Sequence, residues 1–250
     1  MKAARLDAME QYILQNGQVS IEQLQERFGI SINTLRRDLT ELEQRGHVGK
    51  IYGGVTARSP ASLLTMPQRF QINLPAKQRI GELAATVIPD NATVYIDSGS
   101  TTRNVVQYLG GRRSLTLISH SMAVLNAATA LKEITLISPG GIYNASIGAF
   151  VGLSTLETIR SLTVQIAVMA ATGVTIEHGL SNTTYFEAEV KRVVAANCQR
   201  IVLMADHTKF GRDALISYCP LERVNTVVTD RPLAPQYMDF CQDHHIQVLC

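Results

Sequence analysis

The chain has 250 residues, more than one average domain needs, so we expect two domains of unequal size. Apolar residues make up 46% of the chain, which is enough for a sizeable core and excludes bulk disorder. The formal net charge is only +2, which excludes a strongly basic coat protein but leaves room for a local basic patch.

Compartment and cofactors are predicted from what the sequence does not contain. No apolar run approaches the roughly 18–20 residues that a membrane span requires, and the N-terminal segment MKAARLDAMEQY has no hydrophobic signal core. The four cysteines form no C-x-x-C pair and no cluster with histidines at zinc-finger spacing. We therefore expect a cytoplasmic protein with reduced thiols, no membrane partner, no metal site and no cofactor.

The first residues of the chain show helical patterns. Leu6, Met9 and Ile13 recur on one face of a first helix, which ends at an Asn-Gly pair. Ser20 and Gln23 then have the spacing of a capping box, which predicts the start of a second helix.

A tight turn separates the second helix from a third, which is capped by Ser31 and ends at Gly46. Leu35, Leu39 and Leu42 lie on its buried face. The glycine-rich segment that follows favours a small hairpin over a helix. Three helices followed by a hairpin are typical of a winged helix-turn-helix, in which the second helix of the pair enters the major groove of DNA.

The outward face of the third helix carries polar and basic side chains that suit DNA. Arginine reads guanine edges bidentately or clamps phosphates. Residues 1–57 contain seven basic and seven acidic side chains, so spacing alone leaves both a DNA-binding unit and a protein-interaction module open. The candidate DNA-contacting residues are Ser31, Asn33, Thr34, Arg36, Arg37 and Thr40 on the helix and Lys50 and Tyr52 on the hairpin.

The pattern changes after the hairpin. Residues 58–75 contain three prolines and little periodicity, which predicts a linker. In residues 76–250 short apolar strands alternate with helices, which predicts a larger α/β domain with a mainly parallel sheet covered on both faces. The predicted strands are 92–97, 114–118, 134–138, 164–171, 201–205, 226–229 and 246–249, and the predicted helices include 76–88, 185–197 and 234–244.

Small polar loops follow several of these strands. Loops at the carboxyl ends of parallel strands form the ligand crevice of open α/β sheets, and hydroxyls and helix N-terminal amides suit a phosphate. One such loop is also what a helix cap requires, but three in succession predict a polar cleft. The candidate ligand-binding residues are Asp97, Ser98, Gly99, Ser100, Thr101, Thr102, Ser119, His120, Ser121, Gly140 and Gly141.

Further charged residues are weaker candidates on spacing alone. Lys209 follows another strand and has the charge that a phosphate needs, but an isolated lysine is more often simply solvated. The charged residues of the 185–197 helix, which include Lys191 and Arg192, are interpreted mainly as its solvated face.

Several separated motifs resemble the DeoR family of bacterial transcriptional regulators. SINTLRRDLTELEQRGHVGKIYGGV resembles the DNA-binding signature of the family, and DSGSTT, PGG, AFVG and ADHTKFG continue the resemblance in the family's order. The resemblance covers nearly the whole chain, with the linker uninformative. It implies a winged helix-turn-helix followed by a sensor domain that is similar to ribose-5-phosphate isomerase in fold and binds phosphorylated sugars.

The resemblance also implies residue roles and partners. Thr34, Arg36 and Arg37 become the preferred operator contacts, Lys209 becomes an effector contact, and Asp38 is expected to orient an arginine or to lie near the helix surface. We expect a repressor of a sugar-utilisation operon that binds double-stranded operator DNA and is released by a phosphorylated sugar. A monomer would contact one half-site only, so a homodimer or homotetramer is expected.

A sugar-phosphate isomerase with an accessory DNA-binding domain is the alternative. Aldose–ketose isomerisation needs a base, usually a carboxylate held in the cleft. Residues 119–121 and 139–148 contain no Asp, Glu or Lys, and Asp97 is the one carboxylate clearly within the loops. We therefore expect ligand binding without turnover and no catalytic residue.

Departures from the family's pattern bear on ligand choice. Ser119-His120-Ser121 stands where Thr-Asn-Ser is typical, and Gln165 stands in a region where aspartate is frequent. The hairpin has Lys50-Ile51-Tyr52 where arginine and histidine are usual. We expect the first two to alter which sugar phosphate fits, and the third to alter operator contacts without disturbing the hairpin.

Overall fold

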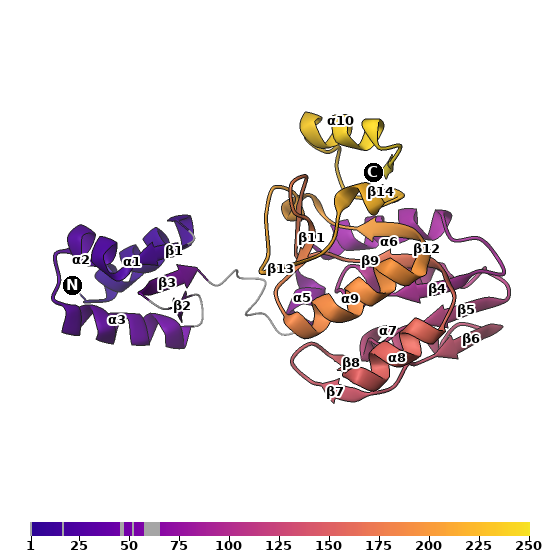
Figure 1. Cartoon of the computed structure of the whole chain (residues 1–250), viewed down its shortest axis with the longest axis horizontal. Coiled ribbons are helices and arrows are strands. Elements are labelled where there is room, and N and C mark those ends of the chain that lie inside the picture. Colours follow the sequence, from indigo (N-terminus) through magenta and orange to yellow (C-terminus); the bar gives the residue numbers. More distant parts are fainter. Residues whose placement is uncertain (1, 17, 46–47, 52, 58–65) are drawn as a thin grey trace. The chain divides into compact units, whose positions relative to one another are not determined.

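The computed structural model describes residues 2–16, 18–45, 48–51, 53–57 and 66–250. The chain divides into two compact units, Met1–Leu64 and Thr65–Cys250 (Figure 1). No helix in the described ranges is both long and apolar enough to cross a membrane.

The first unit contains the three predicted helices and the predicted hairpin. A third strand, which the sequence did not indicate, precedes the second helix and pairs with the hairpin in the order β1-β3-β2. Ser20 and Gln23 form the predicted capping box. The elements are α1 (Lys2–Asn16), β1 (Gln18–Ser20), α2 (Ile21–Phe28), α3 (Ile32–Arg45), β2 (Val48–Ile51) and β3 (Gly54–Ala57).

The core of this unit lies between the helices and the small sheet. Leu35, Leu39 and Leu42 of α3 are buried as predicted, and they pack in one cluster with Leu6 and Met9 of α1. Each fully buried side chain of this size contributes about 1.5–3 kcal/mol relative to its exposed state. This packing holds α3 against the unit by one face and leaves the other face outward.

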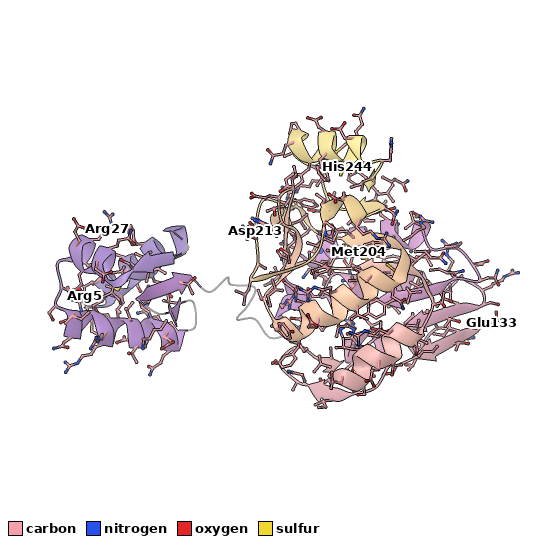
Figure 2. The ribbon with its side chains drawn as sticks, viewed as in Figure 1. Arg5, Arg27, Glu133, Met204, Asp213 and His244 are labelled. Atoms are coloured by element: carbon pink, nitrogen blue, oxygen red, sulfur yellow. The ribbon has the colours of Figure 1, made fainter. Side chains whose placement is uncertain are left out.

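A charged pair crosses the same interface. Asp38 lies on α3 with only 1% of its surface exposed, and both of its carboxylate oxygens accept from Arg5 of α1, at 2.8 and 3.3 Å. Figure 2 labels Arg5 within this unit. Of the two alternatives for Asp38, orientation of an arginine is confirmed, and a position near the helix surface is wrong because α1 covers the carboxylate.

The second unit is built on a seven-stranded sheet in the order β15-β14-β12-β9-β4-β5-β6, in which every pairing is parallel. All seven predicted strands are present, which confirms the predicted α/β class. They are β4 (Thr93–Ile96), β5 (Leu115–Ile118), β6 (Ile134–Ile137), β9 (Val164–Met169), β12 (Cys198–Met204), β14 (Thr226–Val228) and β15 (Gln247–Leu249).

Helices cover both faces of this sheet (Figure 1). The segment after β4 is a 3-10 helix, and the predicted helices at 185–197 and 234–244 are present. The helices are α5 (Met66–Gln71), α6 (Leu74–Thr86), η1 (Thr102–Tyr108), α7 (Met122–Ala128), α8 (Leu153–Ser161), α9 (Tyr185–Asn197), η2 (His207–Lys209), η3 (Leu221–Arg223) and α10 (Pro235–Asp243).

The end of the predicted linker differs in the structure. Helix α5 and the first turn of α6 lie within 58–75, because Pro67 and Pro75 occupy first turns, where a missing N–H costs no hydrogen bond. Residues 58–65, with Pro60, lie outside the described residues.

Alternation along the strands divides the core of the second unit in two. Val94 and Ile96 pack on one face with Met204, which Figure 2 labels, whereas Tyr95 and Ala167 pack on the other. Five short strands outside the large sheet were not predicted from the sequence. They are β7 (Ile142–Asn144), β8 (Ala149–Val151), β10 (Gly173–Thr175), β11 (Gly179–Asn182) and β13 (Ile216–Cys219).

The Arg5–Asp38 pair gives a stability prediction for the first unit. We expect Asp38→Ala to lower the free energy of opening of α1 and α3 by about 1–3 kcal/mol, because the Arg5 guanidinium loses a buried acceptor. Hydrogen exchange of the amides of both helices measures this free energy.

Glu41→Ala is the matched control on the same helix. It removes an ion pair with Lys2 whose partners are 61% and 41% exposed, and such pairs contribute about 0–1 kcal/mol. If both variants lost the same free energy of opening, the burial of Asp38 would add nothing to the stability of this unit.

Candidate functional site: the recognition helix and the carboxyl edge of the sheet

The outward face of α3 presents most of the predicted DNA-contacting residues. Asn33, Arg36 and Arg37 are exposed, and no ion pair or hydrogen bond engages the two arginine side chains within the described part of the chain. The Ser31 hydroxyl accepts from the Thr34 backbone at 3.3 Å, so it caps α3. The free guanidinium groups therefore project from the side of α3 opposite to its packed leucines.

The hairpin residues are less free. The Lys50 ammonium donates to the Thr40 hydroxyl at 2.9 Å and pairs with Glu43 at 3.0 Å, which ties β2 to α3. Tyr52 lies outside the described residues. Arg45 pairs with Asp7 and Glu10 of α1, so its charge holds the unit together.

The candidate residues of the second unit gather at the carboxyl edge of the large sheet. Asp97 follows β4, His120 follows β5, Ala170 follows β9 and Asp206 follows β12. These strands are parallel and neighbouring, so the segments that follow them lie along one edge. The β7–β8 hairpin folds back onto this edge, where the Phe150 amide donates to the His120 carbonyl at 2.8 Å.

A buried ion pair lies at the centre of this edge. The Lys191 ammonium of α9 donates to Asp97 Oδ2 and, at 2.7 Å, to the Ala170 carbonyl. The Ala170 amide donates to the same carboxylate oxygen at 3.0 Å. Both charged side chains are at most 2% exposed. Burial, the largest single effect, would raise the pKa of Asp97, but the charge of Lys191 together with the hydrogen bonds from Lys191 and Ala170 and the neighbouring His120 holds that pKa below its ordinary value.

Three buried polar atoms in the segments after β4 and β5 have no partner among the described residues. They are Asp97 Oδ1, Ser98 Oγ and His120 Nε2, and Thr229 Oγ1 after β14 is a fourth such atom farther along the edge. A buried polar atom without a hydrogen bond costs about 1–3 kcal/mol. Such atoms are rare in folded proteins, and several together at the carboxyl edge of a parallel sheet indicate where a ligand binds.

Other predicted residues in the β4 and β5 loops shape the backbone. The Thr102 hydroxyl lies within hydrogen-bonding distance of the carbonyls of Asp97 and Gly99, at 2.8 and 2.9 Å. The Ser119 hydroxyl donates to the Ile96 carbonyl at 2.6 Å, and the Ser121 hydroxyl caps α7. These three hydroxyls already have protein partners.

The glycines of the predicted site permit close packing. A Cβ on Gly99 would clash with the Cβ of Ala170, so only glycine lets the β4 loop approach β9. A Cβ on Gly141 would clash with the Thr155 hydroxyl, which donates to the Gly140 carbonyl at 2.7 Å. Ser100 and Thr101 are buried, and their carbonyls accept from the side chain of Asn104.

A cluster of positive charge lies beside the end of β12. Lys209 of η2 and Lys77 of α6 interact electrostatically with each other and with Arg69 of α5 and Arg212, against the single carboxylate of Asp206. Burial lowers the pKa of Lys77 to about 8. The charges of Lys209 and Arg69 also lower this pKa, whereas the charge of Asp206 raises it. Burial also lowers the pKa of Lys209. Partly desolvated cations in excess of carboxylates suit a phosphate.

Sequence reasoning missed Lys77, and its interpretation of Lys191, a weak candidate, as part of the solvated face of its helix is wrong because that side chain is buried. Lys77 and Lys191 are 4% and 2% exposed, yet each falls in a helix where it reads as an ordinary surface lysine. The available signal was position: Lys77 lies between Ala76 and Ile80 on the apolar side of α6, where a solvated lysine is not expected.

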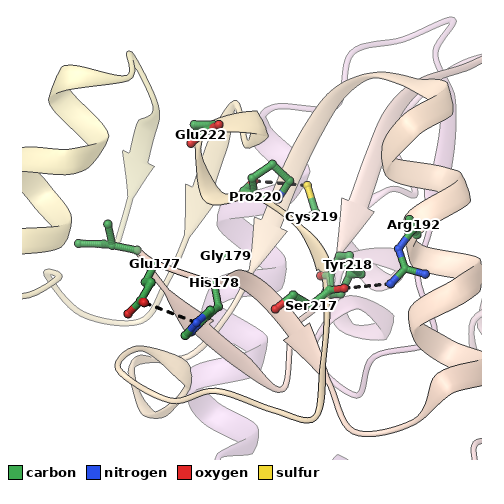
Figure 3. Close-up of a pocket in the computed structure, with 10 residues that line it drawn as sticks. Glu177, His178, Gly179, Arg192, Ser217, Tyr218, Cys219, Pro220 and Glu222 are labelled. Atoms are coloured by element: carbon green, nitrogen blue, oxygen red, sulfur yellow. Dashed lines mark hydrogen bonds and ion pairs between the residues drawn. The ribbon is translucent and has the colours of Figure 1, made fainter.

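A pocket of about 260 Å³ lies elsewhere in the second unit, beside β11, β13 and α9 (Figure 3). Arg192 lines it and donates to the Ser217 carbonyl at 3.0 Å, while His178 pairs with Glu177 and Asp213. None of the unpartnered buried atoms found in the described residues belongs to its lining. The carboxyl edge is therefore the stronger candidate.

Comparison with protein families gives two matches that together span most of the chain. Residues 5–61 match the DeoR-like helix-turn-helix domain, and residues 72–231 match the DeoR C terminal sensor domain. These matches confirm the family resemblance of the sequence motifs.

Named relatives align over nearly their whole length. The HTH-type transcriptional regulator IolR of Bacillus subtilis is 36% identical over 248 residues, which cover 99% of both chains. The glycerol-3-phosphate regulon repressor of Escherichia coli is 30% identical, with 98% of each chain covered. The L-fucose operon activator of Haemophilus influenzae is 28% identical, with 96% of each covered.

Solved structures are more distant. Ribose 5-phosphate isomerase A of Methanocaldococcus jannaschii aligns with a TM-score of 0.42 and 18% identity over 55% of each chain.

The Asp97–Lys191 pair gives a second stability prediction. We expect Lys191→Met to destabilise the protein by about 3–5 kcal/mol, because it leaves a buried carboxylate without its counter-charge. The double variant Asp97→Asn/Lys191→Met should recover most of this loss, because neither charge remains. Urea unfolding of the full chain measures both, and a double variant no more stable than Lys191→Met contradicts the prediction.

Proposed function

Because the chain belongs to the DeoR family of transcriptional regulators, we propose that it represses an operon for sugar use and leaves its operator when a phosphorylated sugar binds. The observation that carries this proposal is the arrangement of the carboxyl edge, where Lys209 and the unpartnered polar atoms follow neighbouring strands and the buried Lys77 of α6 lies beside Lys209.

The phosphate end of the effector site consists of Lys77 and Lys209. Their ammonium groups are already partly desolvated, so a phosphate that displaces the remaining water recovers strong charge-assisted hydrogen bonds. The anionic carboxylate of Asp206 offsets part of this positive charge, but the cations of Lys77, Lys209, Arg69 and Arg212 outnumber it.

The sugar end consists of the β4 and β5 loops. β9 alone separates β4 from β12 in the sheet, so the two ends lie roughly 10 Å apart at a strand spacing of about 4.8 Å. Asp97 Oδ1 and Ser98 Oγ are available to sugar hydroxyls, and the remaining predicted residues of the loops 97–102, 119–121 and 140–141 hold the backbone around them.

Binding without turnover is the reading that the chemistry of Asp97 favours. A general base works best with a pKa near the operating pH. The pKa of Asp97 is instead held below its ordinary value, and one of its oxygens is tied to Lys191 and Ala170. An ionised, firmly paired carboxylate recognises hydroxyls better than it abstracts protons from carbon.

DNA binding is assigned to α3. Arg36 and Arg37 are the proposed base or phosphate contacts, with Asn33 and Thr34 beside them. One chain presents one recognition helix, so we propose a homodimer or homotetramer that spans two half-sites. Relatives named for a glycerol-3-phosphate regulon and an L-fucose operon support sugar-related control.

Effector and operator are coupled only if the sugar phosphate binds the DNA-free arrangement more tightly than the DNA-bound one. By reciprocity, operator DNA must then weaken sugar-phosphate binding by the same factor.

The recognition helix can be tested with duplexes selected from a random-sequence library. We expect Arg36→Ala and Arg37→Ala each to weaken binding to the selected duplex by about 1–3 kcal/mol if the side chain contacts a base. Arg45→Ala is the control, since its side chain pairs with Asp7 and Glu10 instead. Fluorescence anisotropy that shows equal, small losses in all three variants would remove α3 from the interface.

The effector site makes a pH-dependent prediction. Lys77 is protonated near neutral pH and loses its charge as the pH rises through about 8. A phosphate monoester is already a dianion there, since its second pKa is about 6. We therefore expect the affinity for ribose 5-phosphate, fructose 6-phosphate or glycerol 3-phosphate, whichever binds, to fall above this pH in calorimetric titrations.

Lys77→Met should weaken binding at neutral pH and reduce that pH dependence, and operator release should need more sugar phosphate. Lys132→Met, which removes an exposed lysine after α7, should change neither. The proposed site would be contradicted if the Lys77→Met variant bound with unaltered affinity, or if the wild-type protein bound none of the three compounds.

A further inference from the structure

Tyr95 and His120 form a buried polar pair beneath the β7–β8 hairpin. Both side chains are fully buried, and the Tyr95 hydroxyl lies 2.6 Å from His120 Nδ1. Their rings stack with centroids 5.8 Å apart and planes within 11° of each other. The pair is therefore held rigidly, both by its hydrogen bond and by packing.

This contact determines which nitrogen of His120 carries the proton. Among the described residues, Nδ1 of His120 is the only acceptor within reach of the Tyr95 hydroxyl proton. If Nδ1 carried the proton instead, both the Tyr95 hydroxyl proton and the Nε2 lone pair would be buried without a partner, whereas protonation of Nε2 leaves only the Nε2–H unpaired. Tyr95 therefore donates to Nδ1, and the neutral ring carries its proton on Nε2.

The ring is neutral at physiological pH for physical reasons. Burial lowers the pKa of His120 to about 4, and the charge of Asp97 only partly offsets burial while that of Lys191 adds to it. Nε2–H is thus a fixed hydrogen-bond donor, yet it has no acceptor among the described residues. Asp97 Oδ1, its neighbour at the same edge, is a fixed acceptor without a donor.

We propose that His120 Nε2–H and Asp97 Oδ1 together recognise two adjacent oxygens of the effector. A hydroxyl donates to Asp97, and the neighbouring oxygen, a keto group or a second hydroxyl, accepts from His120. Tyr95 is the positioning residue that fixes the donor. The inference rests on the proposed sensor function and assigns the specificity of its sugar end.

The residue type at position 120 makes this selection one-sided. An asparagine is typical of the DeoR family at the position of His120. Its side-chain amide presents both a donor and an acceptor and can exchange them by rotation. A neutral histidine locked by a tyrosine presents a donor only. Oxygens that accept are therefore favoured over groups that can only donate.

The first test is the tautomer of His120 in the ligand-free full chain. Nitrogen NMR of protein labelled in histidine distinguishes protonated from unprotonated ring nitrogens, and comparison with the double variant Tyr95→Phe/His120→Leu assigns the signals. We expect Nε2 protonated in the wild type and a mixture of tautomers in Tyr95→Phe. Protonation of Nδ1 in the wild type would overturn the proposal, because the donor would become an acceptor.

The second test asks whether the pair serves binding or folding. Tyr95→Phe/His120→Leu removes the hydrogen bond together with the unpartnered Nε2–H, so we expect the Tm of the larger unit to rise by roughly 3–6 °C. Tyr218→Phe is the control: Tyr218 is also buried but donates to the Ala170 carbonyl at 2.8 Å, so its loss should lower the Tm. A lower Tm in both variants would give the pair a structural role and overturn the proposal.

The third test adds ligand. Fructose 6-phosphate, ribose 5-phosphate and 2-deoxyribose 5-phosphate are titrated into the labelled wild type. Each compound that raises the Tm should move the His120 Nε2 signal and lose at least tenfold in affinity in the double variant. Binding that leaves this signal in place overturns the specificity assignment. Absence of binding by all three compounds instead contradicts the sensor function itself, while the tautomer and Tm results still stand.

Discussion

The buried ion pair between Lys191 and Asp97 is the interaction on which the second unit depends. It joins α9 to the end of β4 and, through the Ala170 amide and carbonyl, to the end of β9. Because the lysine and the amide occupy one carboxylate oxygen, the other is left charged, buried and unpartnered. This ion pair therefore joins three elements at this edge and leaves one carboxylate oxygen without a hydrogen bond among the described residues.

The carboxyl edge separates two kinds of chemistry along one row of parallel strands. Cations outnumber carboxylates at the β12 end, around Lys77 and Lys209, whereas at the β4–β5 end the Lys191 ammonium is paired with Asp97 and the unpartnered atoms belong to Asp97, Ser98 and His120. A phosphorylated sugar has the same division, with an anion at one end and hydroxyls at the other. The parallel topology places these groups side by side although they are far apart in sequence.

In the first unit the arginines divide into two roles. Arg5 and Arg45 pair with carboxylates of neighbouring helices and hold the helices together, whereas Arg36 and Arg37 are exposed on α3 without such partners. Residues 1–57 have no net charge. The positive charge on the outward face of α3 therefore depends on which arginines are paired with carboxylates, and not on the net charge of the unit. Both units match domains of the DeoR family, so these arginines belong to a transcriptional regulator.

The sequence by itself determined the order of elements, the parallel α/β class, the buried leucines of α3 and the small polar loops that follow the strands, because each depends on local periodicity or on the position of small polar residues. The tertiary structure alone decided the pairing of Asp97 with Lys191 and of Tyr95 with His120, and the burial of Lys77 beside Lys209. Helical spacing cannot distinguish a buried lysine from a solvated one, because the difference depends on which charged groups a distant strand brings within a few ångströms.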